Sequence, residues 1–222
     1  MLYLLRKSEK LKLIDKYHIL SIGCGATPDL MAFEQYAYET GVDKDICYFG
    51  VDVNPRWRNV HERIIAYNSS VINRVTFKYK DAIKYFNKTP IPNTNVIVLQ
   101  YVISHFYNTG QIGQIKDFFV NLVKNVVDQK SRNEPLIILI NDVNSCYRGR
   151  NFFEDFAKIL GDYKHKGYFW KFYFDYRIQN DFQRYGEKHP QNSTLFDLRE
   201  INLDIYESWN ECSSAQMLIE ID

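Results

Sequence analysis

Short apolar runs and longer amphipathic stretches follow one another along the chain in a repeating order. The apolar runs have the length and composition of strands and cover residues 18–23, 46–53, 75–81, 95–102 and 135–143. The stretches that follow them have helical composition and cover residues 28–41, 54–68, 82–86, 111–129 and 151–160. The pattern therefore predicts five strands that alternate with five helices.

Residues at two helix ends support these boundaries. Gly41 follows the last residue of the first helix, where a glycine commonly stops a helix. Asn54 is a candidate N-cap, and Pro55 after it occupies the first helical position, where the missing N–H costs nothing.

The runs at residues 96–100 and 136–140 are apolar at nearly every position, which indicates strands that helices cover on both faces. Residues 167–178 and 213–221 read as two more strands, joined by a long polar segment without a clear helix. We therefore expect an α/β fold: a doubly wound, mostly parallel seven-stranded sheet with an antiparallel C-terminal strand and helices on both faces. No repeat or linker divides the chain, so residues 1–222 are predicted to form a single domain.

Composition narrows the function classes. The 222 residues carry a formal net charge of +1, which provides no overall field toward nucleic acid or anionic lipid. The four cysteines form no CxxC pair, so we expect neither a zinc site, nor any other metal site, nor a disulfide framework. Charged residues interrupt the first 20 positions, unlike a signal peptide or a membrane span. A soluble, cytoplasmic protein is the expectation.

The turn after the first strand contains Gly23 and Gly25, which would let the backbone come close to a ligand. A dinucleotide site would continue as G-x-G-x-x-G, but Pro28 stands at the sixth position. Asp29 adds a negative charge to the helix end on which a diphosphate would rest. A nicotinamide oxidoreductase is therefore disfavoured.

Two acidic residues end the next two strands. Asp52 ends the second strand, where a carboxylate can accept hydrogen bonds from the two ribose hydroxyls of an adenosine, or else begin a turn. Asp81 ends the third strand, where it could accept from an adenine amino group or cap the following helix. Both alternatives stay open for each residue.

Taken in order, these motifs resemble those of the class I S-adenosylmethionine-dependent methyltransferases. The resemblance rests on five segments of residues 18–145: "ILSIGCGATPD", "YFGVDVN", "FKYKDA", "VIVLQYVISHF" and "LIILINDVN". It implies a cofactor-binding core at residues 18–145, followed by C-terminal strands and a polar loop at residues 165–222. It also implies S-adenosylmethionine as the cofactor.

By this resemblance, the residues that contact the cofactor would be Gly23, Cys24 and Gly25 at its methionine moiety, Asp52 at its ribose, Asp81 at its adenine and Gln100 at the pocket rim. The chain departs from the family pattern at Ser21, where an acid usually helps to hold the methionine ammonium, and at Thr27, the usual third small residue. Asp29 or backbone carbonyls are the alternatives for holding that ammonium.

His105, shortly after the fourth strand, is a candidate general base, since an unperturbed histidine titrates near neutral pH; a structural or solvated loop histidine is the alternative. Asp142 and Asn144, at the end of the fifth strand, could orient a methyl acceptor or cap the loop. The polar segment at residues 177–199 has the composition of a loop or lid over a substrate.

The sequence thus predicts methyl transfer to an unidentified acceptor. A small molecule is slightly preferred, and nucleic acid is possible because basic and aromatic residues interleave at residues 77–88 and 167–177. No membrane partner is expected. The alternative is a non-catalytic module that binds an adenosine ligand and acts through a protein or nucleic-acid partner, which the absence of an acid at Ser21 favours.

Overall fold

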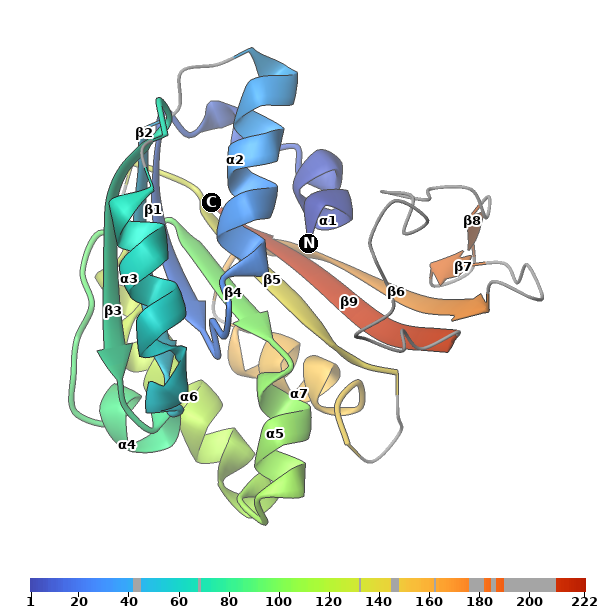
Figure 1. Cartoon of the computed structure of the whole chain (residues 1–222). Helices are drawn as coiled ribbons and strands as arrows, with labels where there is room; N and C mark the ends of the chain where they lie inside the picture. Colours follow the sequence, from blue (N-terminus) through green and yellow to red (C-terminus); the bar gives the residue numbers. More distant parts are fainter. Residues whose placement is uncertain are drawn as a thin grey trace.

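A computed structural model describes nine ranges of the chain: residues 1–41, 45–67, 69–131, 133–144, 148–161, 163–175, 182–184, 187–189 and 211–222. Within them the chain forms one mixed sheet with helices on both faces (Figure 1).

The strands pair in the order β3-β2-β1-β4-β5-β9-β6-β7-β8. Their bounds are Lys16–Ile22 (β1), Asp45–Asp52 (β2), Ile72–Tyr79 (β3), Val96–Gln100 (β4), Leu136–Val143 (β5), His165–Asp175 (β6), Phe182–Arg184 (β7), Glu187–His189 (β8) and Glu211–Ile221 (β9). β1 to β5 are mutually parallel, and β9 lies antiparallel between β5 and β6. The expected seven-stranded, doubly wound sheet with an antiparallel C-terminal strand is confirmed, and the short strands β7 and β8 extend its edge.

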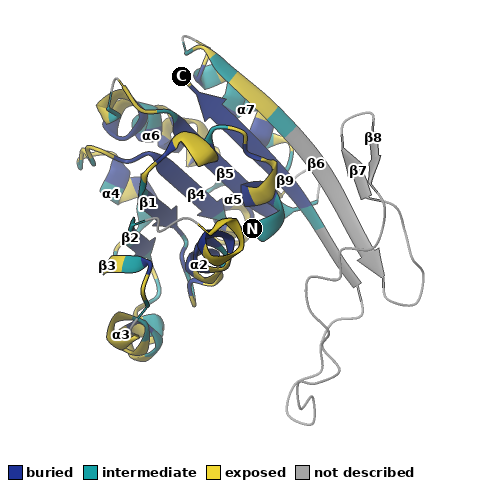
Figure 2. Cartoon of the chain, turned by 90° about the horizontal axis from the view of Figure 1, so that it is seen from above, coloured by how far each residue is buried: buried dark blue, intermediate teal, exposed yellow. Residues whose placement is uncertain are grey.

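Two buried apolar clusters lie on opposite faces of the sheet. One contains side chains of α1 (Leu2–Lys7) and α2 (Pro28–Thr40), with α3 (Arg58–Ala66) at its margin. The other contains side chains of α4 (Ala82–Phe86), α5 (Val102–Asn108), α6 (Ile115–Asn125) and α7 (Phe152–Ile159). β4 and β5 are buried along almost their whole length (Figure 2), which agrees with their continuous apolar runs.

The strand order creates the place for a ligand. β2 and β3 follow β1 on one side of it, whereas β4 and β5 lie on its other side. The order in which strands are added to the sheet therefore reverses between β1 and β4, although the two strands are parallel. In open α/β sheets such a reversal leaves a crevice beyond the carboxyl ends of the strands.

The sequence pattern missed two helices, α1 and α5, and misplaced several element boundaries. α1 was not predicted, and of residues 101–102, read as the end of a strand, Tyr101 precedes α5 and Val102 begins it. Tyr101 precedes that helix with a φ of 56°, a left-handed conformation that apolar periodicity does not indicate. The predicted helix 54–68 begins with a 3-10 turn at Pro55–Trp57 before α3, and the helix predicted at 111–129 is α6 with a 3-10 turn at each end.

The two residues predicted to mark helix ends do so in the structure. Gly41 adopts a φ of 62° at the end of α2, and the Asn54 side chain accepts a hydrogen bond from the Arg56 N–H, so both terminal signals are confirmed. Most of the polar segment 177–199 lies outside the described residues. In the part of the chain that the structure describes, no helix is both long and apolar enough to cross a membrane.

Candidate functional site

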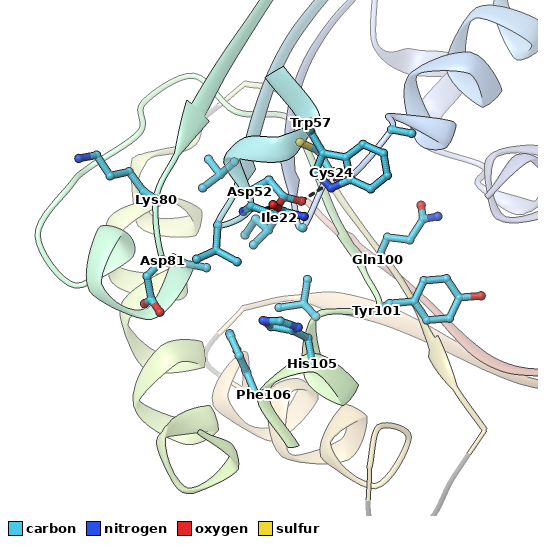
Figure 3. A pocket seen from close by; sticks show the side chains of 18 of the residues that line it. Ile22, Cys24, Asp52, Trp57, Lys80, Asp81, Gln100, Tyr101, His105 and Phe106 are labelled. Carbon is cyan, nitrogen blue, oxygen red and sulfur yellow. Dashed lines mark hydrogen bonds between the residues drawn. The ribbon is translucent and has the colours of Figure 1, made fainter. Parts of the chain in front are cut away.

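A cavity of about 400 Å³ opens beyond the carboxyl ends of β1, β2 and β4. Its walls come from the turn after β1, the residues after β2 and β3, and the first turns of α5. Figure 3 shows Asp52 and Asp81 on one side of the cavity, Gln100 and Tyr101 on the opposite side, and His105 below. Seven of the eight predicted site residues line this one cavity: Gly23, Cys24, Gly25, Asp52, Asp81, Gln100 and His105.

The glycine turn is packed so closely that a side chain at Gly23 would not fit. Gly23 has a φ of 69°, and a Cβ atom there would lie 2.8 Å from Val102 Cγ2 and 3.2 Å from the Gln100 carbonyl oxygen. Its N–H donates to the Val51 carbonyl at 2.8 Å, which holds the turn against β2. Gly25 also adopts a positive φ, of 49°. The backbone of the turn thus forms the inner wall of the cavity.

Between the two glycines, the Cys24 side chain packs into the protein. A Cβ atom on Gly50 would lie 2.8 Å from the Cys24 Sγ atom, so the absence of a side chain at Gly50 makes room for the sulfur. Burial raises the pKa of the Cys24 thiol, with the charges of Asp52 and Asp29 acting in the same direction. The thiol is therefore protonated at neutral pH, and the backbone is the part of Cys24 best suited to contact a ligand.

Asp52 links β2 to the glycine turn. Its Oδ2 atom accepts a hydrogen bond from the Gly25 N–H at 2.9 Å, and its Oδ1 atom accepts from the Asn54 N–H at 2.8 Å. Each carboxylate oxygen has a further lone pair, so these contacts orient the group toward the cavity and leave it able to accept from ligand hydroxyls. The turn-forming role and the pocket position of Asp52 therefore coexist.

Asp81 shows the same combination at the next strand. Its Oδ1 atom accepts from the Lys84 N–H at 3.0 Å as the N-cap of α4, and its Oδ2 atom accepts from Gln111 Nε2 at 3.2 Å. Asp81, Gln111 and Ala82 all line the cavity. The helix-capping interpretation is confirmed, and an adenine contact at Asp81 stays a prediction.

His105 lies on α5 rather than in a loop, which corrects its expected local structure. The helix directs the imidazole toward the cavity beside Phe106 (Figure 3). Tyr101, which precedes the helix, also lines the cavity and has 42% of its surface exposed. The imidazole is thus placed where it could exchange a proton with a ligand.

Asp142 does not line the cavity but lies beneath α5. It is 1% exposed, and its carboxylate accepts hydrogen bonds from the N–H groups of Ile103 at 2.9 Å, Ser104 at 3.3 Å and Val143 at 2.7 Å. Burial raises the Asp142 pKa, although the hydrogen bonds oppose that rise. These contacts point to the positioning of α5, and hence of His105, rather than to contact with a substrate. Asn144, its predicted companion, accepts a hydrogen bond from Arg150 at 2.5 Å.

Asp29 also lies away from the cavity, on the inner side of α2. It is fully buried, and the Tyr48 hydroxyl lies 3.1 Å from both of its oxygens. Burial raises the Asp29 pKa, and the hydrogen bonds from the Tyr48 hydroxyl oppose that rise. Asp29 is therefore paired with Tyr48 inside the protein, and it is not placed to substitute for an acid that contacts a cofactor.

Two residues of the site were not anticipated from the sequence. His61 on α3 is 1% exposed, and its Nε2 atom lies 2.7 Å from the Gly25 carbonyl oxygen. Trp57 lines the cavity, and its ring lies 4.0 Å from where a Cβ atom on Gly25 would be. Both lie in the segment that connects β2 with β3, and no motif in the sequence connects either one with the glycine turn.

No family model matches the chain, and no curated protein matches its sequence. Three solved structures with a similar fold are all named methyltransferases. They are an S-adenosylmethionine-dependent methyltransferase from Archaeoglobus fulgidus (18% identity, TM-score 0.48, covering 99% of this chain and 91% of that one), precorrin-6y C5,15-methyltransferase from Geobacter metallireducens (13%, 0.44, 97% and 83%) and magnesium protoporphyrin IX methyltransferase from Synechocystis with bound S-adenosylmethionine (11%, 0.45, 99% and 74%).

Proposed function

We propose that the protein is an S-adenosylmethionine-dependent methyltransferase of class I type. The observation that carries the proposal is that the Gly23–Gly25 turn and the Asp52 carboxylate meet in one cavity, joined by the 2.9 Å hydrogen bond from the Gly25 N–H. The turn offers close backbone approach, and Asp52 offers a charged acceptor for ribose hydroxyls.

The remaining lining residues suit the cofactor's shape and charge. Asp81 and Ala82 line the same cavity as Asp52, which supports an adenine contact there when the ribose contacts Asp52. The absence of a side chain at Gly23, where one would clash, lets a ligand approach the backbone of the turn. The Asp52 and Asp81 carboxylates suit a ligand that carries hydrogen-bond donors, and the Trp57 ring offers an apolar wall. Pro28, at the position of the third glycine of a dinucleotide motif, also lines the cavity and departs from the pattern of a nicotinamide dinucleotide site.

S-adenosylmethionine supplies an activated methyl group on a sulfonium, so little covalent chemistry is left to the protein. The chain must align an acceptor and exclude water. His105 would take a proton from an acceptor oxygen or nitrogen, and Asp142 would hold α5 in place through the N–H groups of Ile103 and Ser104. A small-molecule acceptor is preferred, with nucleic acid as the alternative.

Calorimetric titration with S-adenosylmethionine and S-adenosylhomocysteine tests the cofactor assignment. Binding of both ligands supports the proposal. Failure of both at millimolar concentration, together with binding of a nicotinamide dinucleotide, contradicts it. Transfer of label from methyl-labelled cofactor to candidate acceptors then separates an enzyme from a module that only binds an adenosine ligand.

The role of His105 has its own test once an acceptor is found. His105→Ala should lower turnover by roughly 10²- to 10⁴-fold with little change in cofactor affinity, as expected for the loss of a general base. His165→Ala is the matched control, because the His165 ring contacts the Tyr163 carbonyl at 2.8 Å and does not line the cavity. Equal turnover of the two variants would remove His105 from catalysis.

A further inference from the structure

The Gln100 side chain carries a buried acceptor without a partner. Its Oε1 atom is shielded from solvent and accepts no hydrogen bond within the part of the chain that the structure describes. Gln100 is the last residue of β4 and lines the cavity. A buried carbonyl without a donor is costly, and such groups in native proteins call for an explanation.

The Gln100 Oε1 atom differs from the carboxylate oxygens that line the cavity, because those oxygens already have hydrogen-bond donors. Both oxygens of Asp52 and both oxygens of Asp81 already accept hydrogen bonds from the chain. The Gln100 Oε1 atom is the buried side-chain acceptor in this lining that has no donor. A ligand that fills the cavity would be expected to bring a donor to it.

The position of Gln100 identifies which part of the cofactor would reach it. β1 separates β2 from β4, so Gln100 lies across the glycine turn from Asp52 and Asp81 (Figure 3). With the adenosine at Asp52 and Asp81, the opposite end of the cofactor extends past Gly23 toward Gln100. The backbone carbonyl oxygen of Gln100 lies only 3.2 Å from where a Cβ atom on Gly23 would be, so the end of β4 is next to the glycine turn.

We propose that Gln100 Oε1 accepts a hydrogen bond from the α-ammonium group at the amino-acid end of the cofactor. This assignment rests on the proposed function. Beyond its adenosine, S-adenosylmethionine has one hydrogen-bond donor, the ammonium, because its carboxylate and sulfonium have no hydrogen to donate at neutral pH. The amide oxygen of Gln100 thus binds the ammonium group, which Asp29 cannot reach because it faces the protein interior.

A second glutamine provides a matched control. Gln100 on β4, Asn141 on β5 and Gln216 on β9 lie side by side in the sheet register. Gln216 Oε1 is also buried without a partner, but Gln216 lies two strands from Gln100 and does not line the cavity. Its Nε2 atom donates to Asn141 Oδ1 at 3.0 Å. Replacement of either glutamine by methionine removes the buried amide oxygen and keeps a side chain of similar length.

The experiment compares two ligands by calorimetry. S-adenosylhomocysteine carries the amino-acid end, and 5′-methylthioadenosine lacks it. Gln100→Met should weaken S-adenosylhomocysteine binding by about tenfold and leave methylthioadenosine binding within about twofold, since only the first ligand has the ammonium. Gln216→Met should change neither affinity. Equal effects of Gln100→Met on both ligands, or none on either, would overturn the assignment.

A measurement on the unaltered protein guards against a variant that does not fold. The wild-type protein should bind S-adenosylhomocysteine at least about tenfold more tightly than the analogue in which hydrogen replaces the amino group. Equal binding of these two ligands would overturn the role of Gln100 while leaving the proposed function intact. Failure of all the adenosine ligands to bind would instead overturn the proposed function, and this assignment with it.

Discussion

The Nε2 atom of His61 lies 2.7 Å from the carbonyl oxygen of Gly25, although the two residues are 36 positions apart in the chain. A carbonyl oxygen only accepts, so Nε2 carries the hydrogen and donates it. The Nδ1 atom lies 2.9 Å from the Tyr79 hydroxyl, and the ring stacks on Phe77 with centroids 3.7 Å apart. Through His61, α3 and β3 together hold the glycine turn in its conformation.

Replacement of His61 by phenylalanine should therefore loosen the turn. The His61→Phe variant keeps a flat ring against Phe77 but leaves the Gly25 carbonyl without its donor, so we expect the free energy of unfolding to fall by about 1–3 kcal/mol. Affinity for S-adenosylhomocysteine should fall as well. Urea denaturation and calorimetry measure the two effects.

Tyr79→Phe is the control for His61. It removes the hydroxyl from His61 Nδ1 but leaves the contact with Gly25, so stability should fall while affinity stays nearly unchanged. If both variants lower the affinity equally, His61 acts on general stability and not through the glycine turn.

Gly23→Ala tests the packing of the turn. The new Cβ atom would lie 2.8 Å from Val102 Cγ2 at a φ of 69°, whereas at Gly110, with a φ of 71°, a Cβ atom would meet nothing within 4 Å. Gly110→Ala should cost about 1–2 kcal/mol of folding stability through the left-handed backbone alone. Gly23→Ala should cost about 1–3 kcal/mol more, because the crowding adds to that strain. Equal losses in urea denaturation would show that the turn has room for a side chain.

Asp52→Ala should weaken S-adenosylhomocysteine binding by about 1–3 kcal/mol, because a charged acceptor for the ribose hydroxyls is lost and the Gly25 N–H loses its partner. The fold should survive. Asp45→Ala, at the other end of β2, removes an exposed ion pair with Lys16 and should leave the calorimetric dissociation constant unchanged. An unchanged constant for folded Asp52→Ala would place the ribose elsewhere.

Asp142→Asn should lower stability by about 1–2 kcal/mol, since one of the carboxylate oxygens that cap α5 becomes an amide donor facing the Ile103 and Ser104 N–H groups. Turnover should fall together with stability, because α5 carries His105. A large loss of turnover at full stability, measured by urea denaturation, would instead indicate a direct catalytic role for Asp142.

Asp29 predicts a pH dependence of stability. Burial raises its pKa in the folded protein above the value of about 3.9 expected in the unfolded chain. Between those two pKa values the folded state retains a proton that the unfolded state releases, so the contribution of Asp29 to stability decreases as pH rises through this window. Asp29→Asn has no proton to release at this position.

The stability of Asp29→Asn relative to wild type should therefore increase with pH across that window and level off above it. Urea denaturation of both proteins over a pH series measures this difference. A difference independent of pH would mean that burial beside Tyr48 does not raise the Asp29 pKa.

The parts of the site that could be predicted from the sequence are those that local chemistry specifies. Continuous apolar runs such as 136–140 indicate a strand covered on both faces, wherever it lies in the sheet. A strand followed by Gly23 and Gly25 specifies a turn that few other residues could form, since both adopt a positive φ. Asp52 ends its strand and so belongs to the carboxyl edge of the parallel sheet, where a ligand binds.

Tertiary structure decided the features whose partners are distant in the chain. α5 has only seven residues and follows Tyr101, which has a left-handed backbone conformation. The carboxylate that accepts from its first N–H groups belongs to Asp142, 39 positions from Ile103. Because no local signal marks the start of this helix, its apolar first residues read as the end of a strand. Asp29, in the first turn of α2, faces inward because the Tyr48 hydroxyl on β2 supplies a hydrogen-bond donor. His61 meets Gly25, and Gln100 Oε1 is left without a donor, only after the sheet has brought its strands together. The sequence alone determined the strands, the glycine turn and the edge to which Asp52 belongs, because these depend on neighbours along the chain. The direction in which each polar side chain points depends on which donors and acceptors the folded protein leaves unpaired.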